Sequence, residues 1–235
     1  MFFKCAKHVC FAGDSRQRIF GTHDVIPTIQ SRVETIELKT HYRIGHEICR
    51  AADVVGKAAG FSSILETCNY KDAESKVHFV PSSTDEEQIK KLIDGLTVQL
   101  TAYPDELLAV VGPRKQDSEF LREQLEASIL APLILPHRNS GSDDPEQRIY
   151  VAHLLEIKGL EFRTIHLVRM QYLHRLRESQ KRIAYTAITR AKTTVSVYYT
   201  NKIPGYLEQA QVVVEPPKPR PPLQDLFPRK KKGKK

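Results

Sequence analysis

Apolar residues recur along the chain with two periods, one typical of amphipathic helices and one typical of buried strands. The helical period is clearest in five residues that share one face: Ile89, Leu92, Ile93, Leu96 and Leu100. Just before them, Thr84-Asp85-Glu86-Glu87 has the form of a capping box. A helix is therefore predicted from about residue 84 to 100.

Three further segments show the helical period. The first contains Ile44, Ile48, Ala51, Ala52 and Val55. The second follows Gly112-Pro113, and its apolar face, expected to point toward the core, contains Phe120, Leu121, Leu125 and Ile129. The third spans about 178–192 and contains Ile183, Ala187, Ile188 and Ala191. Each segment predicts one helix with an apolar face.

Short apolar runs between these helices predict buried strands. They lie near residues 7–12, 36–38, 107–111, 149–154, 165–168 and 195–199. Strands that alternate with helices in this way favour a mostly parallel sheet with helices on both faces. The predicted fold class is therefore α/β.

Basic charge is concentrated at the end of the chain. Residues 218–235 hold eight Lys or Arg and one acid, Asp225, so 8 − 1 = +7 of the net charge of +8 lies there and about +1 remains elsewhere. Proline is frequent in the same region, which predicts a disordered tail over 208–235. Such a basic tail can attract nucleic-acid phosphates without recognising a base sequence. The alternative is a basic segment that only increases solubility or resembles a nuclear-import signal.

Cysteine content and hydropathy argue against two classes of protein. Four cysteines, Cys5, Cys10, Cys49 and Cys68, are too few for a disulfide framework and are interpreted as small core residues. Cys5, His8 and Cys10 lie on a predicted strand, where residues of opposite parity face opposite sides, so no zinc site is expected there. The chain lacks a run of 18 apolar residues and a signal-peptide core, so a cytoplasmic protein without a membrane partner is expected.

Four short segments place cations, carboxylates or amides at predicted strand ends or helix starts, the positions where α/β sheets bind ligands. They are residues 13–20 (GDSRQRIF), 41–45 (HYRIG), 158–162 (KGLEF) and 185–192 (YTAITRAK). In this order they resemble the later motifs of UvrD/Rep-type superfamily 1 DNA helicases, GDxxQ, YR, KGLEF and TRAK. Four motifs in sequence are specific, whereas any one alone is weak.

The resemblance covers about residues 7–206 and implies a RecA-like domain of the P-loop NTPase type. It divides the chain into residues 1–30, a remnant of a first RecA-like domain with the GDxxQ loop, and residues 31–207, a second RecA-like domain without a large insertion. The tail from 208 to 235 follows. The implied activity is ATP-driven translocation on DNA and unwinding of it, in the context of DNA repair.

The resemblance also implies catalytic roles for three residues. Gln17 would sense the γ-phosphate or the attacking water, and Arg43 and Arg190 would act as arginine fingers, since a guanidinium is a permanently charged, rigid donor. The plainer alternatives are a loop glutamine that caps backbone groups and two surface salt bridges.

Four further residues are implied to bind the cofactor, ATP with Mg²⁺. Tyr42 would stack on the adenine, and Glu161 would accept hydrogen bonds from the ribose hydroxyls. Lys158 and Gly159 would shape the loop that couples nucleotide to nucleic acid. The alternatives are a packed tyrosine and a solvated Lys158–Glu161 charge pair.

Two departures from the family pattern affect what is expected. Many relatives have Thr-x-His before the KGLEF lysine, whereas this chain has His153 and Leu155 at the aligned positions. His153 is therefore interpreted as a buried strand histidine rather than a DNA contact. The sequence also contains no GxxxxGK[ST] loop and no apolar strand ending in Asp-Glu, so its ATP site lacks the groups that bind the β-phosphate and magnesium.

The sequence thus predicts the C-terminal part of an ATP-dependent DNA helicase, inactive alone. Its expected partners are DNA at a single-strand/duplex junction and a protein or segment that supplies the first RecA-like domain. In a bacterium it would be associated with the nucleoid. The alternative, from another class, is a non-catalytic module that binds nucleic acid or a helicase through its surface and tail.

Overall fold

The computed structural model describes residues 13, 14, 16, 26–31, 33–38, 40–71, 74–136, 144, 146–173 and 178–215. The expected strand at 7–12, Gln17 and residues 216–235 of the expected tail lie outside this set, as do Cys5, His8 and Cys10. The first helix of the described residues is the short α1 (Ile26–Gln30), and the exposed residues 33–38 follow it before the main body.

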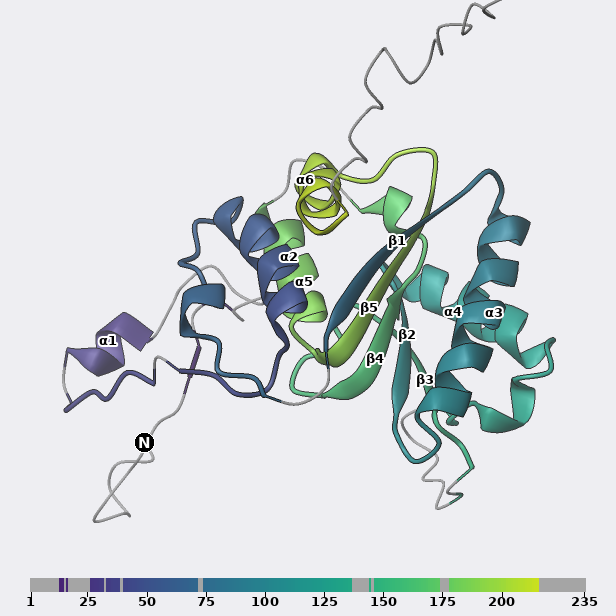
Figure 1. Ribbon diagram of the computed structural model, residues 1–235, viewed down its shortest axis with the longest axis horizontal. Coiled ribbons are helices and arrows are strands. Elements are labelled where there is room, and N and C mark those ends of the chain that lie inside the picture. Colours follow the sequence, from purple (N-terminus) through teal and green to yellow (C-terminus); the bar gives the residue numbers. More distant parts are fainter. Residues whose placement is uncertain are drawn as a thin grey trace, which may run out of the picture.

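A five-stranded sheet forms the centre of the molecule, and all its strand pairs are parallel (Figure 1). The strands lie in the order β1-β5-β4-β2-β3. Their bounds are β1 Lys76–Ser82, β2 Leu108–Gly112, β3 Ile149–His153, β4 Phe162–Leu167 and β5 Ala191–Thr200. All of β2 and nearly all of β5 are buried, because helices cover both faces of the sheet. The predicted α/β class is confirmed.

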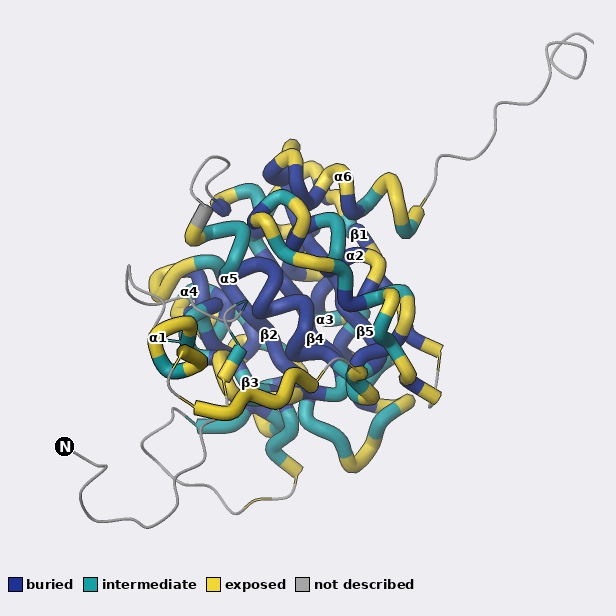
Figure 2. The backbone as a smooth tube through the Cα atoms, turned by 90° about the vertical axis from the view of Figure 1, so that its left-hand side faces the viewer, coloured by how far each residue is buried: buried dark blue, intermediate teal, exposed yellow. Residues whose placement is uncertain are grey.

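Five helices make up the two covering layers (Figure 1). One face carries α2 (His46–Lys57), α5 (Glu178–Ile188) and α6 (Gly205–Val214), and the other carries α3 (Asp85–Ala102) and α4 (Lys115–Glu126). Short 3₁₀ turns lie at η3 Leu65–Thr67, η4 Ala131–Leu133 and η5 Met170–Tyr172. Two apolar clusters fill the space between the layers, and Figure 2 shows this buried interior in dark blue.

The structure confirms one half of the capping box predicted at the start of α3, the hydrogen bond to the Thr84 side chain. The Thr84 hydroxyl accepts a hydrogen bond from the Glu87 amide at 3.2 Å. The Glu87 carboxylate accepts one from the Ser83 amide at 2.7 Å, one residue before the cap itself. One of the amides that a helix start leaves without partners, that of Glu87, is thus satisfied by the cap.

Two sequence predictions about apolar residues were wrong. Residues 36–38 form no strand within the described part of the chain, and the side chains of Ile36 and Leu38 are 82% and 88% exposed. A strand is stable only when its backbone pairs with a neighbour, and no described strand pairs with this segment. Ile129 is 80% exposed rather than inward, because α4 ends at Glu126 and the chain then turns.

Two predicted boundaries also differ. The helix expected to reach 192 ends at Ile188, since the β-branched and aromatic residues after Lys192 extend β5 back to Ala191. The boundary expected at 207 falls inside α6, whose residues Tyr206, Leu207 and Ala210 are buried. Residues 208–214 therefore belong to the folded body rather than to a disordered tail.

A buried histidine connects α3 with the sheet. His166 of β4 has no exposed surface, and its Nε2 lies 2.8 Å from Gln99 Oε1. Because an amide oxygen only accepts, Nε2–H is the donor and Nδ1 accepts from the Tyr198 hydroxyl at 3.0 Å. Both ring nitrogens are satisfied in the neutral form.

None of the described helices is both long and apolar enough to cross a membrane.

His166 is expected to stay neutral in the folded protein at mildly acidic pH. Burial lowers its pKa from 6.5 to about 3, so the unfolded chain binds a proton between these values and the folded protein does not. Above the unfolded pKa this residue leaves stability unchanged, and below it stability falls, by about 2 kcal/mol at about pH 5. In an NMR titration the ring resonances of His166 should stay constant from about pH 7 to about pH 5. A midpoint near the ordinary histidine pKa would contradict this.

Candidate functional site

The amino-terminal edge of β4 and β5 brings two predicted site residues together. The strands pair in parallel with Phe162 opposite Ala191, and the Phe162 amide donates to the Arg190 carbonyl at 3.0 Å. Glu161 and Arg190, which immediately precede these two positions, are therefore neighbours across the strand pair. The sequence led us to expect these motifs at strand ends or helix starts, but KGLEF and TRAK run into the first residues of β4 and β5.

Arg43 joins these residues from a distant part of the chain. Its Nη1 lies 2.5 Å from Glu161 Oε1, and its Nη2 donates to the Thr189 carbonyl at 3.4 Å. Arg43 belongs to the segment that leads into α2. The structure thus places Arg43, Glu161 and Arg190 in one cluster, which we call the arginine cluster.

A close approach of backbone at Gly45 fixes the segment that carries Arg43. A Cβ at position 45 would lie 2.2 Å from the Ser75 Cβ, so any larger residue displaces one of the two segments. The Ser75 hydroxyl accepts from the Glu47 amide at 3.0 Å, and Glu47 Oε1 accepts from the Val77 amide at 2.8 Å. These contacts place the first turn of α2 beside the start of β1.

Arg190 is a buried cation with an incomplete set of partners. It is 3% exposed, and its Nε donates to the Thr186 carbonyl at 3.3 Å. Its Nη2 is buried without a hydrogen-bond partner in the described part of the chain. Burial lowers the pKa of Arg190 and the charge of Arg43 lowers it further, whereas Glu161, Asp14 and Tyr185 oppose this. An anion placed here would relieve both the desolvation and the repulsion.

The charges of the arginine cluster do not balance. Arg43, Arg190 and Glu161 together carry one excess positive charge, and the Asp14 carboxylate, which also acts on Arg190, is itself paired with Arg16. The side chains of Arg43 and Glu161 are 36% and 40% exposed, so a ligand can reach them. The guanidinium groups of Arg43 and the buried Arg190 are fixed, charged donors, and such donors favour phosphate or carboxylate ligands.

The other predicted site residues lie next to the cluster in sequence. Tyr42 is 65% exposed, so its ring is accessible for stacking rather than packed in the core. Lys158 and Gly159 lie in the exposed turn between β3 and β4. Gly159 has φ +83°, a left-handed conformation that favours glycine, which gives a backbone reason for that residue.

The described part of the GDxxQ segment lies on the same side of the molecule. Asp14 Oδ1 accepts from the Arg16 amide at 2.9 Å and from its Nε at 3.1 Å. The charge of Asp14 also acts on Arg190, whose pKa it raises against the effect of burial. Gln17 lies outside the described residues, so its predicted role stays a prediction.

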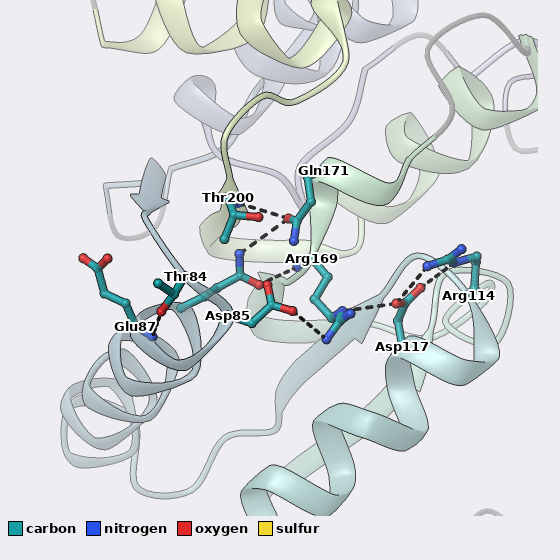
Figure 3. A network of polar contacts seen from close by, with 9 residues as sticks. Thr84, Asp85, Glu87, Arg114, Asp117, Arg169, Gln171 and Thr200 are labelled. Atoms are coloured by element: carbon teal, nitrogen blue, oxygen red, sulfur yellow. Dashed lines mark hydrogen bonds and ion pairs between the residues drawn. The ribbon is translucent and has the colours of Figure 1, made fainter.

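A second polar cluster, at the carboxyl edge of the sheet, was not identified from the sequence (Figure 3). Asp117, 2% exposed, accepts from Arg114 Nε at 2.7 Å and forms an ion pair with Arg169 at 3.2 Å. Arg169 also pairs with Asp85 at 3.3 Å, and its guanidinium lies 4.3 Å from the centre of the Phe120 ring. One feature of the sequence could have indicated this cluster: Arg114 comes just after β2 and Arg169 just after β4, and these two strands are neighbours in the sheet.

His153 differs from its sequence interpretation. It lies at the end of β3 but is only partly buried, with its side chain 18% exposed. Its Nδ1 lies 2.7 Å from Glu156 Oε2. His153 is therefore positioned by a carboxylate in the following turn rather than enclosed within the sheet.

Comparison with known proteins supports the fold. No protein-family model matches the sequence, and no curated protein matches it. Among solved structures, the C-terminal domain of a possible DNA helicase from Lactobacillus plantarum WCFS1 superposes with a TM-score of 0.55 at 16% identity. The match covers 75% of this chain and 96% of that domain.

Two viral structures also match, with lower scores. They are a crystal structure of the PRRSV nsp10 helicase and a structure of PRRSV helicase, each at 16% identity, with TM-scores of 0.33 and 0.38. This chain spans 27% and 26% of their lengths. The comparison with the bacterial domain shows that the chain has the RecA-like α/β fold of a helicase C-terminal domain.

Proposed function

We propose that this chain is the second motor domain of an ATP-dependent DNA helicase or translocase of the UvrD/Rep type. In this proposal Arg43 and Arg190 bind the phosphates of a nucleotide whose opposite wall comes from a first RecA-like domain. The observation that carries the proposal is the convergence of Arg43, Glu161 and Arg190, which are separated by up to 147 residues in the sequence (190 − 43).

The donor set of the arginine cluster fits a phosphate. Arg190 Nη2 is buried and has no partner among the described residues, and a phosphate oxygen would supply one. Arg43 is accessible and already lies beside Arg190, so both cations are available to one anionic group. Guanidinium groups positioned in this way stabilise the charge that develops during phosphoryl transfer, which is the chemistry that ATP supplies when bound.

Glu161 has two functions in this proposal. Its Oε1 pairs with Arg43, which orients that guanidinium before the nucleotide is bound. Its Oε2 forms no hydrogen bond with the described residues and is free to accept one from a ribose hydroxyl. The exposed ring of Tyr42 provides a stacking surface for the base, and Lys158 and Gly159 form the adjacent turn.

The remaining half of the site requires other groups. The sequence contains no GxxxxGK[ST] loop to bind the β-phosphate and no strand-end Asp-Glu pair to bind Mg²⁺. A protein or segment with a first RecA-like domain would supply both, and Gln17 would lie between the two halves. Nucleotide-dependent closure of the two domains would then drive movement along DNA.

The purified chain is expected to hydrolyse ATP no faster than a buffer blank. Half of the phosphate-binding groups are missing from the sequence, so bound nucleotide would not be activated. A coupled steady-state ATPase assay with and without single-stranded DNA tests this. Turnover of about 1 s⁻¹ or more would contradict the half-site proposal, because that rate requires a complete site.

Inorganic tripolyphosphate is expected to raise the melting temperature of the chain at low ionic strength, because it binds the folded arginine cluster. Arg43→Ala should remove most of this stabilisation. Arg50→Ala, at an exposed position on α2, is the matched control and should retain it. Differential scanning fluorimetry over a range of tripolyphosphate concentrations gives the apparent affinities.

Glu161→Gln should act in the opposite direction to Arg43→Ala. It removes the carboxylate that neutralises one guanidinium, so tripolyphosphate should bind several-fold more tightly while the ligand-free protein becomes less stable. Equal responses of the Arg43→Ala, Arg50→Ala and parent proteins would show that the anion binds elsewhere and would contradict the proposed site.

A further inference from the structure

Three side chains that bind metals well lie together beneath the segment that carries Arg43. They are His41, Cys49 and Cys68, and their ligand atoms all lie within 4.8 Å of one another. The Cys49 sulfur is 3.7 Å from His41 Nε2. Both cysteines are free thiols, and Cys49 is fully buried.

Backbone contacts bring the three residues together from separate parts of the chain. His41 forms an isolated parallel bridge with Cys68, in which the His41 amide donates to the Thr67 carbonyl at 3.1 Å. The Asn69 amide donates to the His41 carbonyl at 2.8 Å. Cys49 lies in the first turn of α2, where its amide donates to the Gly45 carbonyl at 3.0 Å. Backbone hydrogen bonds therefore hold the three segments together, and these bonds bring the three side chains close to one another.

The three groups have few strong partners besides one another. His41 Nε2 lies 2.7 Å from the Ile64 carbonyl oxygen and donates to it, whereas the buried Nδ1 has no partner among the described residues. The thiols of Cys49 and Cys68 both approach the Ile44 carbonyl, at 3.5 and 3.3 Å, and thiols are weak donors. The nitrogen that faces Cys49 is Nε2, so metal binding there would replace its contact with the Ile64 carbonyl and leave the proton on Nδ1.

We propose that His41, Cys49 and Cys68 form a binding site for Zn²⁺ or a similar thiophilic divalent cation. One imidazole and two thiolates are a ligand set that zinc prefers, and the two thiolates neutralise its charge. Zinc bonds of about 2.0–2.3 Å place neighbouring ligand atoms about 3.5 Å apart, so the cluster needs only a small contraction. The Ile44 carbonyl oxygen or a water molecule completes four-coordination.

The site would connect three segments that determine where Arg43 lies. His41 and Ile44 flank Arg43 in the chain, Cys49 belongs to α2, and Cys68 follows η3. A bound cation would reduce the freedom of this connection and hold Arg43 beside Glu161. This consequence for Arg43 rests on the proposed function, whereas the metal site itself does not.

The test uses the full chain, reduced and free of oxygen, titrated with Co²⁺ as a spectroscopic probe. One equivalent should produce the intense near-ultraviolet charge-transfer band of thiolate–cobalt bonds and visible bands of tetrahedral cobalt, and Zn²⁺ should abolish both by displacement. Zn²⁺ should also raise the melting temperature. Neither measurement depends on ATP or DNA, so failure here is distinguishable from failure of the proposed function.

Substitutions test which residues bind the cobalt ion. Cys68→Ser, at a partly buried position, and His41→Ala should each lose the charge-transfer band or weaken cobalt affinity at least about 10-fold. The double variant Cys5→Ser/Cys10→Ser is the matched control and should bind one equivalent unchanged. The proposal is wrong if Cys68→Ser binds cobalt with the parent's affinity and charge-transfer band, or if binding disappears in the control. It is equally wrong if the reduced protein binds no cobalt and mild oxidation instead joins Cys49 to Cys68.

Discussion

The parallel pairing of β4 with β5 at Phe162 and Ala191 determines the rest of the candidate site, and the register of the two strands shifts by one residue between Phe162 and Thr164. Because Phe162 lies opposite Ala191, the residues just before them, Glu161 and Arg190, are adjacent at the amino edge of the sheet. Phe162 and Ala191 are both buried in the hydrophobic core, so packing holds this pair in place although the register shifts after it. The hydrophobic core that holds this pair therefore also fixes the spacing of the charged groups.

The electrostatics of the cluster are unfavourable in the isolated chain and become favourable when an anion is bound. Arg190 is desolvated, lies near Arg43 and has one nitrogen without a partner in the described part of the molecule. Glu161 is the carboxylate within the cluster, and Asp14, which also acts on Arg190, is itself paired with Arg16. Such a local cost persists in a folded protein when the surrounding packing is strong enough to impose it, and it is typical of sites that bind a charged ligand. The buried sheet beneath the cluster provides that packing.

Local patterns in the sequence were sufficient for the elements but not for their long-range contacts. The α3 helix follows from its capping box and apolar face, and β2 follows from its apolar run. Residues 36–38 have a strand-like composition, yet strand formation depends on a neighbour that no local pattern specifies. The motif resemblance grouped Arg43, Glu161 and Arg190, but their meeting at an amino edge depends on strand order. The His41, Cys49 and Cys68 cluster has no short-range spacing signal and becomes visible only in three dimensions.

The central claim is that Arg43 and Arg190 bind the phosphates of one nucleotide. NMR of the arginine side chains during an ATP titration measures this most directly, since the Nε–H resonance of each guanidinium reports its own contacts. The account predicts that the resonances of Arg43 and Arg190 shift together and saturate at the same ATP concentration, while that of Arg122, paired with Glu126 on α4, stays unchanged. Saturable ATP binding with both cluster resonances unmoved, or with only one of them shifted, would contradict it.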